Sequence, residues 1–245
     1  MERIKIEGKL HEGNTFYFFN KDYISEFVYG GIDGAITTFA VVAGAAGANA
    51  DLQWVLIFGF ANLIADGFSM SVGNFFAVKS ERDRYEKHKA IEYWEVDHLR
   101  EKEVEEIREI YEAKGFKGKL LEDVVGVITA DKDVWVDTMM KEELEMTKDD
   151  KTPFSTAFTT FISFVLVGLI PLLSYIGAVF FDLAETNLFM VSCVATGLAM
   201  ALIGYLKSWV NEKSWVKGVL ETLLLGGLAA ILAYFAGDLL AKWFL

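Results

Sequence analysis

Residues 52–78 read LQWVLIFGFANLIADGFSMSVGNFFAV, and residues 79–89 continue directly as KSERDRYEKHK. The first segment is long enough to cross the hydrocarbon core of a membrane as a helix, which takes about 20 mostly apolar residues. The second segment is too highly charged to remain there, yet no Pro or Gly occurs before Gly115 to stop the helix. The sequence therefore predicts a membrane helix that continues out into water.

Similar apolar stretches flank this segment, and the charged residues are gathered between them. Residues 79–152 contain 15 of the 23 Lys and Arg and 22 of the 35 Asp and Glu. The five apolar stretches are 27–50, 52–78, 154–181, 187–206 and 216–241. We expect an all-α polytopic membrane protein with five transmembrane helices and a cytoplasmic helical metal-binding insert between helices 2 and 3. The expected parts are an N-terminal segment 1–26, helices 1 and 2 in 27–78, the acidic insert 79–152, and helices 3 to 5 in 153–245.

The distribution of Lys and Arg predicts the orientation, because short loops rich in these residues stay in the cytoplasm. Basic residues precede the first span, follow the second and follow the fourth, whereas the other two loops have none. We therefore expect the N-terminus and the insert in the cytoplasm and the C-terminus outside, with Lys242 as a mild exception. Residues 1–26 have no apolar core, so no removable signal peptide is expected. The predicted location is a multi-pass position in the cell membrane.

Composition also excludes several kinds of function. A net charge of −12 disfavours nucleic acid and favours cations as partners. Cys193 is the only cysteine, so the chain has neither an internal disulfide nor a cysteine-based zinc site. His11, His88 and His98 form no two-histidine helical motif, which leaves a zinc hydrolase without support. We expect no enzymatic activity and no organic cofactor.

Polar residues at membrane depth are costly and by default indicate a functional path. Asp33 lies in the first span, and Asn62, Asp66, Met70 and Asn74 recur every four residues in the second. Residues four apart share a helix face, so the second span carries a stripe of amide, carboxylate and thioether groups suited to a divalent cation. The alternative is that the two Asn residues only hydrogen-bond neighbouring helices, as polar side chains in membrane bundles often do.

Two pairs of glutamates stand out in the insert. Glu92 and Glu95 are three residues apart, and Glu103 and Glu106 repeat that spacing 11 residues later. All four share one face of an unbroken helix, but Glu92 and Glu103 are then about 16 Å apart, too far for one ion. Either the helix breaks between the pairs or each pair makes its own site. The alternative is an ordinary solvated acidic face.

The stretch DVWVDTMMKEELEM, residues 133–146, sets two thioethers beside carboxylates. On a helix Met139 and Met140 both lie about one turn from Glu143. Sulfur and oxygen donors together suit a borderline divalent ion. This stretch alone favours a core position for the two methionines over a ligand role, since Met commonly fills irregular apolar gaps.

Taken together, these motifs resemble the vacuolar iron transporter family, also called the yeast calcium-sensitive cross-complementer family, from about Ile24 to Trp243. The family's motifs occur here in the same order: Asp33-Gly34, Ser69-Met70, Lys79 to Glu81, the two Glu pairs, and Trp135 to Leu144. One position departs from the plant and fungal pattern, because Asn62 replaces a Glu and a carboxylate, Asp66, occurs one turn later.

The resemblance implies dimers of five-helix subunits that exchange Fe2+ for protons across a lipid bilayer. It assigns metal capture to a set in the insert: Glu92, Glu95, Glu103, Glu106, Met139, Met140 and Glu143. It assigns a membrane path at the dimer interface to Asp33, Asn62, Asp66 and Met70. Mn2+ is a second candidate cargo, and binding of Co2+ and Zn2+ is also expected. Two alternatives stay open, a manganese exporter and a membrane-tethered metal buffer or sensor that does not transport.

Overall fold

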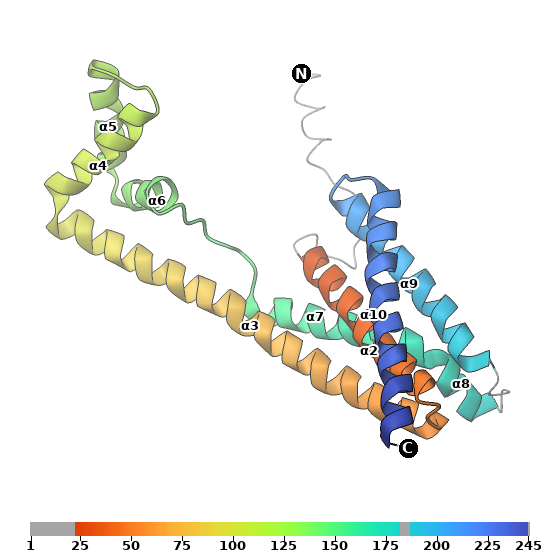
Figure 1. The fold of residues 1–245 in the computed structure, drawn as a ribbon. Coiled ribbons are helices and arrows are strands. Elements are labelled where there is room, and N and C mark those ends of the chain that lie inside the picture. The colour runs from red at the N-terminus through yellow and green to blue at the C-terminus, as the bar shows by residue number, and fades with distance from the viewer. Residues whose placement is uncertain (1–22, 182–186, 245) are drawn as a thin grey trace. The chain divides into compact units, whose positions relative to one another are not determined.

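The computed structural model describes residues 23–181 and 187–244, and every regular element in these ranges is a helix (Figure 1). The elements are α2 (Ile24–Gly47), α3 (Leu52–His98), α4 (Arg100–Ala113), α5 (Lys119–Ala130), α6 (Lys132–Glu142), α7 (Pro153–Gly168), η2 (Ile170–Leu172), α8 (Leu173–Phe181), α9 (Leu188–Val210) and α10 (Trp215–Phe244). Five helical segments are long and apolar enough to cross a membrane. The all-α fold class and the five spans are confirmed, and the protein is an integral multi-pass membrane protein.

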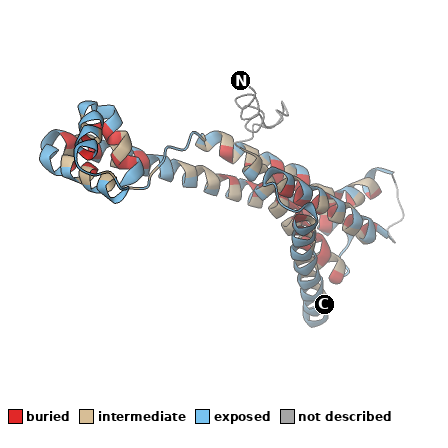
Figure 2. Cartoon of the chain, turned by 90° about the horizontal axis from the view of Figure 1, so that it is seen from above, coloured by how far each residue is buried: buried red, intermediate tan, exposed pale blue. Residues whose placement is uncertain are grey.

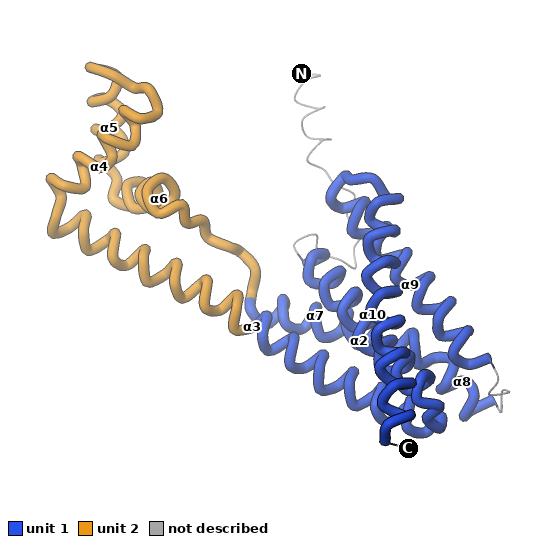
Figure 3. The backbone as a smooth tube through the Cα atoms, viewed as in Figure 1, with its two compact units in different colours: residues 1–75, 153–245 blue, residues 76–152 orange. Residues whose placement is uncertain are grey.

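Several expectations lie outside the described residues. They concern most of the N-terminal segment 1–26 with its basic residues, His11, and the Lys-free loop around 182–185. The chain otherwise divides into two compact units, residues 76–152 and the remainder (Figure 3). We call residues 76–152 the acidic domain and the remainder the membrane bundle.

In the membrane bundle, α2 packs against α7, α9 and α10. Close approach requires glycine at Gly34, where an added Cβ would collide with the backbone carbonyl of Phe164 on α7. Small residues at such crossings let membrane helices pack backbone to backbone. The transmembrane part of α3 joins the bundle through side chains: Leu63 packs with Phe164, and Ser71 donates a hydrogen bond of 2.7 Å to the carbonyl of Ala157.

The third span is not one uninterrupted α-helix. It consists of α7, the short 3-10 turn η2 and α8, with Pro171 in the turn. Proline has no N–H and its ring clashes with the preceding helical turn, which explains the break. Ser192 on α9 donates a hydrogen bond of 2.7 Å to the Pro171 carbonyl, so the interruption is held by a neighbouring helix.

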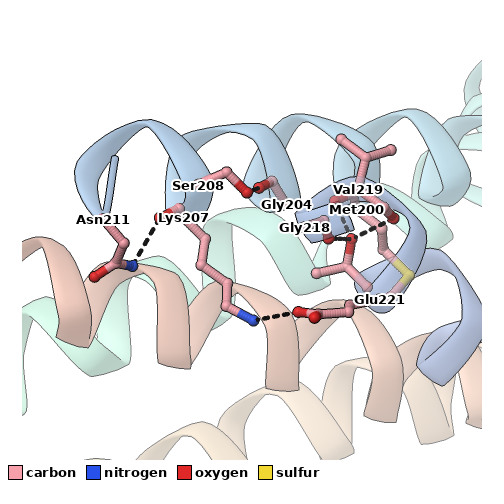
Figure 4. A network of polar contacts seen from close by, with 9 residues as sticks. Met200, Gly204, Lys207, Ser208, Asn211, Gly218, Val219 and Glu221 are labelled. Atoms are coloured by element: carbon pink, nitrogen blue, oxygen red, sulfur yellow. Dashed lines mark hydrogen bonds and ion pairs between the residues drawn. The ribbon is translucent and has the colours of Figure 1, made fainter. Parts of the chain in front are cut away.

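The hairpin of α9 and α10 is held by polar contacts as well as by glycine (Figure 4). Lys207 forms an ion pair with Glu221 at 3.1 Å, and the Asn211 amide donates to the Lys207 carbonyl at 2.7 Å. Thr222 donates to the Met200 carbonyl across the helix pair at 3.0 Å. The Lys207–Glu221 and Thr222–Met200 contacts join the two helices, whereas the Asn211 hydrogen bond stays within the end of α9, before the four-residue loop 211–214.

The acidic domain contains the last part of α3 with α4, α5 and α6 around their own core. Figure 2 shows buried residues gathered between these helices, and Ile107, Trp135 and Val136 are fully buried. Gly118, at φ 58°, is the N-cap residue of α5, and the Asp131 side chain caps α6 by accepting hydrogen bonds of 2.9 and 3.2 Å from the N–H groups of Asp133 and Val134. A small separate core therefore supports this domain.

Two helix boundaries in the acidic domain differ from the sequence prediction. The uninterrupted helix expected up to Gly115 breaks at Leu99, where α3 ends and α4 begins. The break lets Val96 and Ile107 enter one core, which a straight helix prevents because they would lie far apart along it. The composition of the following stretch predicts a helix from about Asp133 to Thr147. In the structure α6 ends earlier, at Glu142, and beyond it the Met146 N–H donates to the Met140 carbonyl while Glu145 adopts φ 52°.

Candidate metal centre

The break at Leu99 brings three glutamates together. One carboxylate oxygen from each of Glu92, Glu95 and Glu103 lies within 4.8 Å of the other two. Glu92 and Glu95 come from the end of α3, and Glu103 comes from the first turns of α4. Of the two arrangements open from the sequence, the structure has the broken helix, with both pairs contributing to one cluster.

Two of these carboxylates are buried and have oxygen atoms without a hydrogen-bond partner. Glu92 is 3% exposed and Glu103 is 1% exposed. Glu92 Oε2 and both carboxylate oxygens of Glu103 accept no hydrogen bond within the described chain. An unpaired buried polar atom is destabilising, so atoms of this kind are expected to face a partner such as a cation.

The surroundings raise the pKa values of these groups. Burial, followed by the charges of Glu143, Glu95 and Glu106, raises the pKa of Glu92 to about 7. Burial, followed by the charges of Glu106, Glu95 and Glu92, raises the pKa of Glu103 to about 7. Desolvation and like charges both disfavour the ionised form. A divalent cation removes both penalties, so the site can release protons when it takes up metal near neutral pH.

Glu143 extends the cluster from α6. It is the C-terminal residue that caps α6, and burial, then Glu106, raises its pKa, so its charge interacts with the same group. The structure therefore brings Glu92, Glu95, Glu103, Glu106 and Glu143 into one interacting set. This places the expected acidic residues of three helices together.

Met139 and Met140 lie directly in the hydrophobic core. Both are fully buried, and they pack with Ile107, Trp135 and Val136. This location agrees with the core interpretation of the pair, while their role as ligands remains a prediction. A thioether ligand would favour a borderline ion over Mg2+ or Ca2+.

Lys102 belongs to this site and was not identified from the sequence. Its ammonium lies 2.7 Å from a Glu106 carboxylate oxygen and 4.0 Å from Glu103. The i,i+4 spacing of Lys102 and Glu106 was the available signal, since such pairs attract on a helix. Lys102 partly offsets the negative charge of the cluster.

The residues expected along the membrane path lie on the bundle side of α3 and on α2. The Asn62 amide donates a long hydrogen bond of 3.4 Å to Thr37 on α2, and Asn74 donates one of 2.8 Å to Thr160 on α7. These contacts agree with the helix-joining interpretation of the two Asn residues. Asp33 on α2 and Asp66 on α3 are both half-buried, and Met70 packs at the edge of the core around Phe164 and Leu172.

Comparison with known proteins places this chain in a family. The profile of the VIT family matches residues 24–238. The chain is 35% identical over 227 residues to a vacuolar iron transporter of Toxoplasma gondii (strain ATCC 50861 / VEG), covering 90% of this chain and 75% of the relative. It is 32% identical over 226 residues to vacuolar iron transporter 1 of Eucalyptus grandis, covering 92% and 89%. It is 32% identical over 237 residues to vacuolar iron transporter 1 of Arabidopsis thaliana, covering 95% and 93%. With its five membrane helices and its glutamate cluster, the chain belongs to the VIT family.

Proposed function

We propose that the protein exports Fe2+ from the cytoplasm in exchange for protons and accepts Mn2+ as a second cargo. The observation that carries this proposal is the cluster of Glu92, Glu95 and Glu103, whose oxygens lie within 4.8 Å in a five-span membrane protein. Membership of the VIT family supports metal transport, and the names of its relatives point to iron. Fe2+ is the substrate in this proposal, and no organic cofactor takes part.

The acidic domain is the proposed capture site on the cytoplasmic side. Its proposed ligands are Glu92, Glu95, Glu103, Glu106, Met139, Met140 and Glu143. The raised pKa values of Glu92 and Glu103 support capture coupled to proton release, because metal binds only the ionised carboxylates. The buried thioethers of the core support a preference for a borderline ion.

The proposed path through the membrane uses Asp33, Asn62, Asp66 and Met70 at the interface of a homodimer. Asp33 and Asp66 are half-buried carboxylates on two helices that the Asn62–Thr37 hydrogen bond joins, which supports a shared cation position. Large apolar side chains of α3, such as Ile64 and Phe68, are exposed in the single chain and need lipid or a second copy to cover them. A dimer built on the first two membrane helices would place two sets of path residues side by side.

Flux into proteoliposomes tests the proposal. The purified protein is reconstituted, and uptake of Fe2+, Mn2+, Co2+, Zn2+ and Ca2+ is compared with and without an imposed pH gradient. We expect Fe2+ flux that rises with the gradient and falls strongly in a Glu92→Gln, Glu103→Gln double variant. Glu112→Gln is the matched control, because Glu112 is an exposed glutamate on α4 that lies on the opposite face of the helix from Glu103. Metal flux that is independent of the pH gradient would contradict the proposed exchange of metal for protons.

The same preparation separates transport from storage. If metal binds with the affinity set by the glutamates but no ion crosses the bilayer in any condition, the protein is a membrane-tethered buffer or sensor. If Mn2+ flux exceeds Fe2+ flux at equal concentration, the protein is a manganese exporter. Each outcome replaces the proposal with one of its alternatives.

A further inference from the structure

Glu106 is a proposed metal ligand that already holds a cation. The carboxylate oxygens that meet within 4.8 Å belong to Glu92, Glu95 and Glu103, and we call these three residues the glutamate triad. A carboxylate oxygen of Glu106 instead lies 2.7 Å from the Lys102 ammonium, which is 4.0 Å from the nearest oxygen of Glu103. A positive charge of the chain itself therefore occupies this carboxylate beside the triad.

Glu106 lies between two neighbours on the surface of α4. Successive residues of an α-helix are about 100° apart, so Glu106 lies about 40° round the helix from Lys102 and about 60° from Glu103 on the other side. Residues three and four apart on a helix are within reach of each other. One side-chain conformation of Glu106 therefore meets the lysine, and another turns toward the triad.

The Lys102 side chain can leave this position easily. It is 62% exposed, against 25% for Glu106, and an exposed ion pair contributes little to stability by itself. The hydrogen bond to Glu106 and the charge of Glu106, followed by the charges of Glu103 and Glu95, raise the pKa of Lys102. The negative charge of the whole site therefore attracts the ammonium, and a divalent ion bound to the triad would cancel much of that charge.

We propose that Lys102 is a positioning residue of the capture site, which holds the Glu106 carboxylate away from the triad until a divalent ion binds. The ion carries twice the charge of the ammonium, so it cancels the attraction for Lys102 and repels it at short range. Lys102 then moves into solvent, and Glu106 turns to the ion as a further ligand. A monovalent ion brings no excess of charge over the ammonium, so the exchange favours divalent cations. The inference rests on the capture site of the proposed function.

A double-mutant cycle on the full-length protein tests this arrangement. Calorimetry measures the Co2+ affinity of the unmodified protein, Lys102→Gln, Glu106→Gln and the double variant. We expect Lys102→Gln to bind Co2+ about tenfold more tightly, because the change removes a competing cation and frees Glu106. In the Glu106→Gln background the same change should gain about threefold, since only the repulsion is then removed. Lys102→Arg keeps the charge and should keep the unmodified affinity. Lys119→Gln, at an exposed lysine of α5, is the control for net charge and should also leave the affinity unchanged.

The failure of this inference and the failure of the proposed capture site give different results. Equal gains from Lys102→Gln with and without the Glu106 carboxylate would show that the lysine acts by repulsion alone, and would overturn the inference while leaving the site intact. The same gain from Lys102→Arg would also overturn it, because the charge is then not what matters. Co2+ binding that is unchanged in the Glu92→Gln, Glu103→Gln double variant would place capture elsewhere and overturn both. Amide protection of α4 no lower than in the unmodified protein shows that each variant is folded.

Discussion

Replacing Glu103 by Gln should stabilise the metal-free acidic domain and abolish its response to metal. The folded-state pKa of Glu103 is raised from an ordinary value of 4.5 to about 7. A carboxyl group with a raised folded pKa is tolerated below pH 4.5, where both states are protonated. It destabilises the fold progressively as pH rises to 7, because the unfolded state ionises first. At 1.36 kcal/mol per pKa unit, the penalty at pH 7.5 is about 3 kcal/mol, carried by a side chain that is 1% exposed.

Amide hydrogen exchange on the full-length protein measures this penalty in the acidic domain alone. At pH 7.5 without metal, amides of α4 and α6 in Glu103→Gln should be protected up to about a hundredfold more than in the unmodified protein, since 1.4 kcal/mol is a factor of ten. Adding Co2+ should raise protection in the unmodified protein and have little effect on the variant. Glu112→Gln, an exposed change on the opposite face of the same helix, should alter neither.

The result that would refute this reasoning is a Glu103→Gln variant no better protected than the unmodified protein at pH 7.5 without metal. That outcome would mean that the Glu103 carboxylate is solvated or already paired. The buried charges of the glutamate cluster would then not destabilise the metal-free fold, and a cation would have no such penalty to remove. The same comparison at about pH 3.5, where Glu103 is protonated in both states, should show no difference, which provides an internal check on the sign.

Three further predictions concern the site and the path. Metal affinity should fall as pH drops below about 7, where protons compete for Glu92 and Glu103, and calorimetry with Co2+ across pH 6 to 8 measures this directly. Met139→Leu and Met140→Leu should each cost less than about 1.5 kcal/mol of stability, because the swap conserves apolar volume. If the thioethers are ligands, the pair should still weaken Co2+ binding more than Mn2+ binding, and equal effects on the two ions would assign both methionines to packing alone. Asp66→Asn should abolish proteoliposome flux while capture persists, and Asn62→Glu in that background should partly restore flux by returning a carboxylate about 6 Å away on the same face; flux at the unmodified rate would make Asp66 structural.

The membrane spans were predictable because lipid demands long apolar helices, and no tertiary contact is needed to recognise them. The cluster was predictable only in part. Glu92 and Glu103 share a helical face by spacing, but their meeting depends on the break at Leu99, a residue with no Gly or Pro beside it. That break follows from packing Val96 and Ile107 into one core, which is a tertiary effect. The break in the third span had a local signal, Pro171, within an otherwise continuous apolar run.

Glu143 and Lys102 illustrate the two kinds of residue that sequence patterns treat differently. Glu143 is predicted as a site residue because it lies in a stretch that resembles a family motif. Lys102 is not predicted, because a cationic side chain is not a metal ligand. The structure shows that Lys102 stands among the carboxylates. Ligand-type residues in the sequence therefore do not predict the neighbouring cations that set the charge of a site.

The position of Lys102 has a consequence for how long an ion would stay. Its ammonium is 4.0 Å from a carboxylate oxygen of Glu103, so it would repel a divalent ion held by the cluster. Repulsion of this kind raises the dissociation rate, and differences in affinity between related complexes appear mostly in that rate. If the glutamate cluster passes ions to the membrane path, a residence time of hours at the cluster would limit the rate of transport. Removing the charge with Lys102→Gln would lengthen the residence time of each ion, so the cluster would release its ions more slowly.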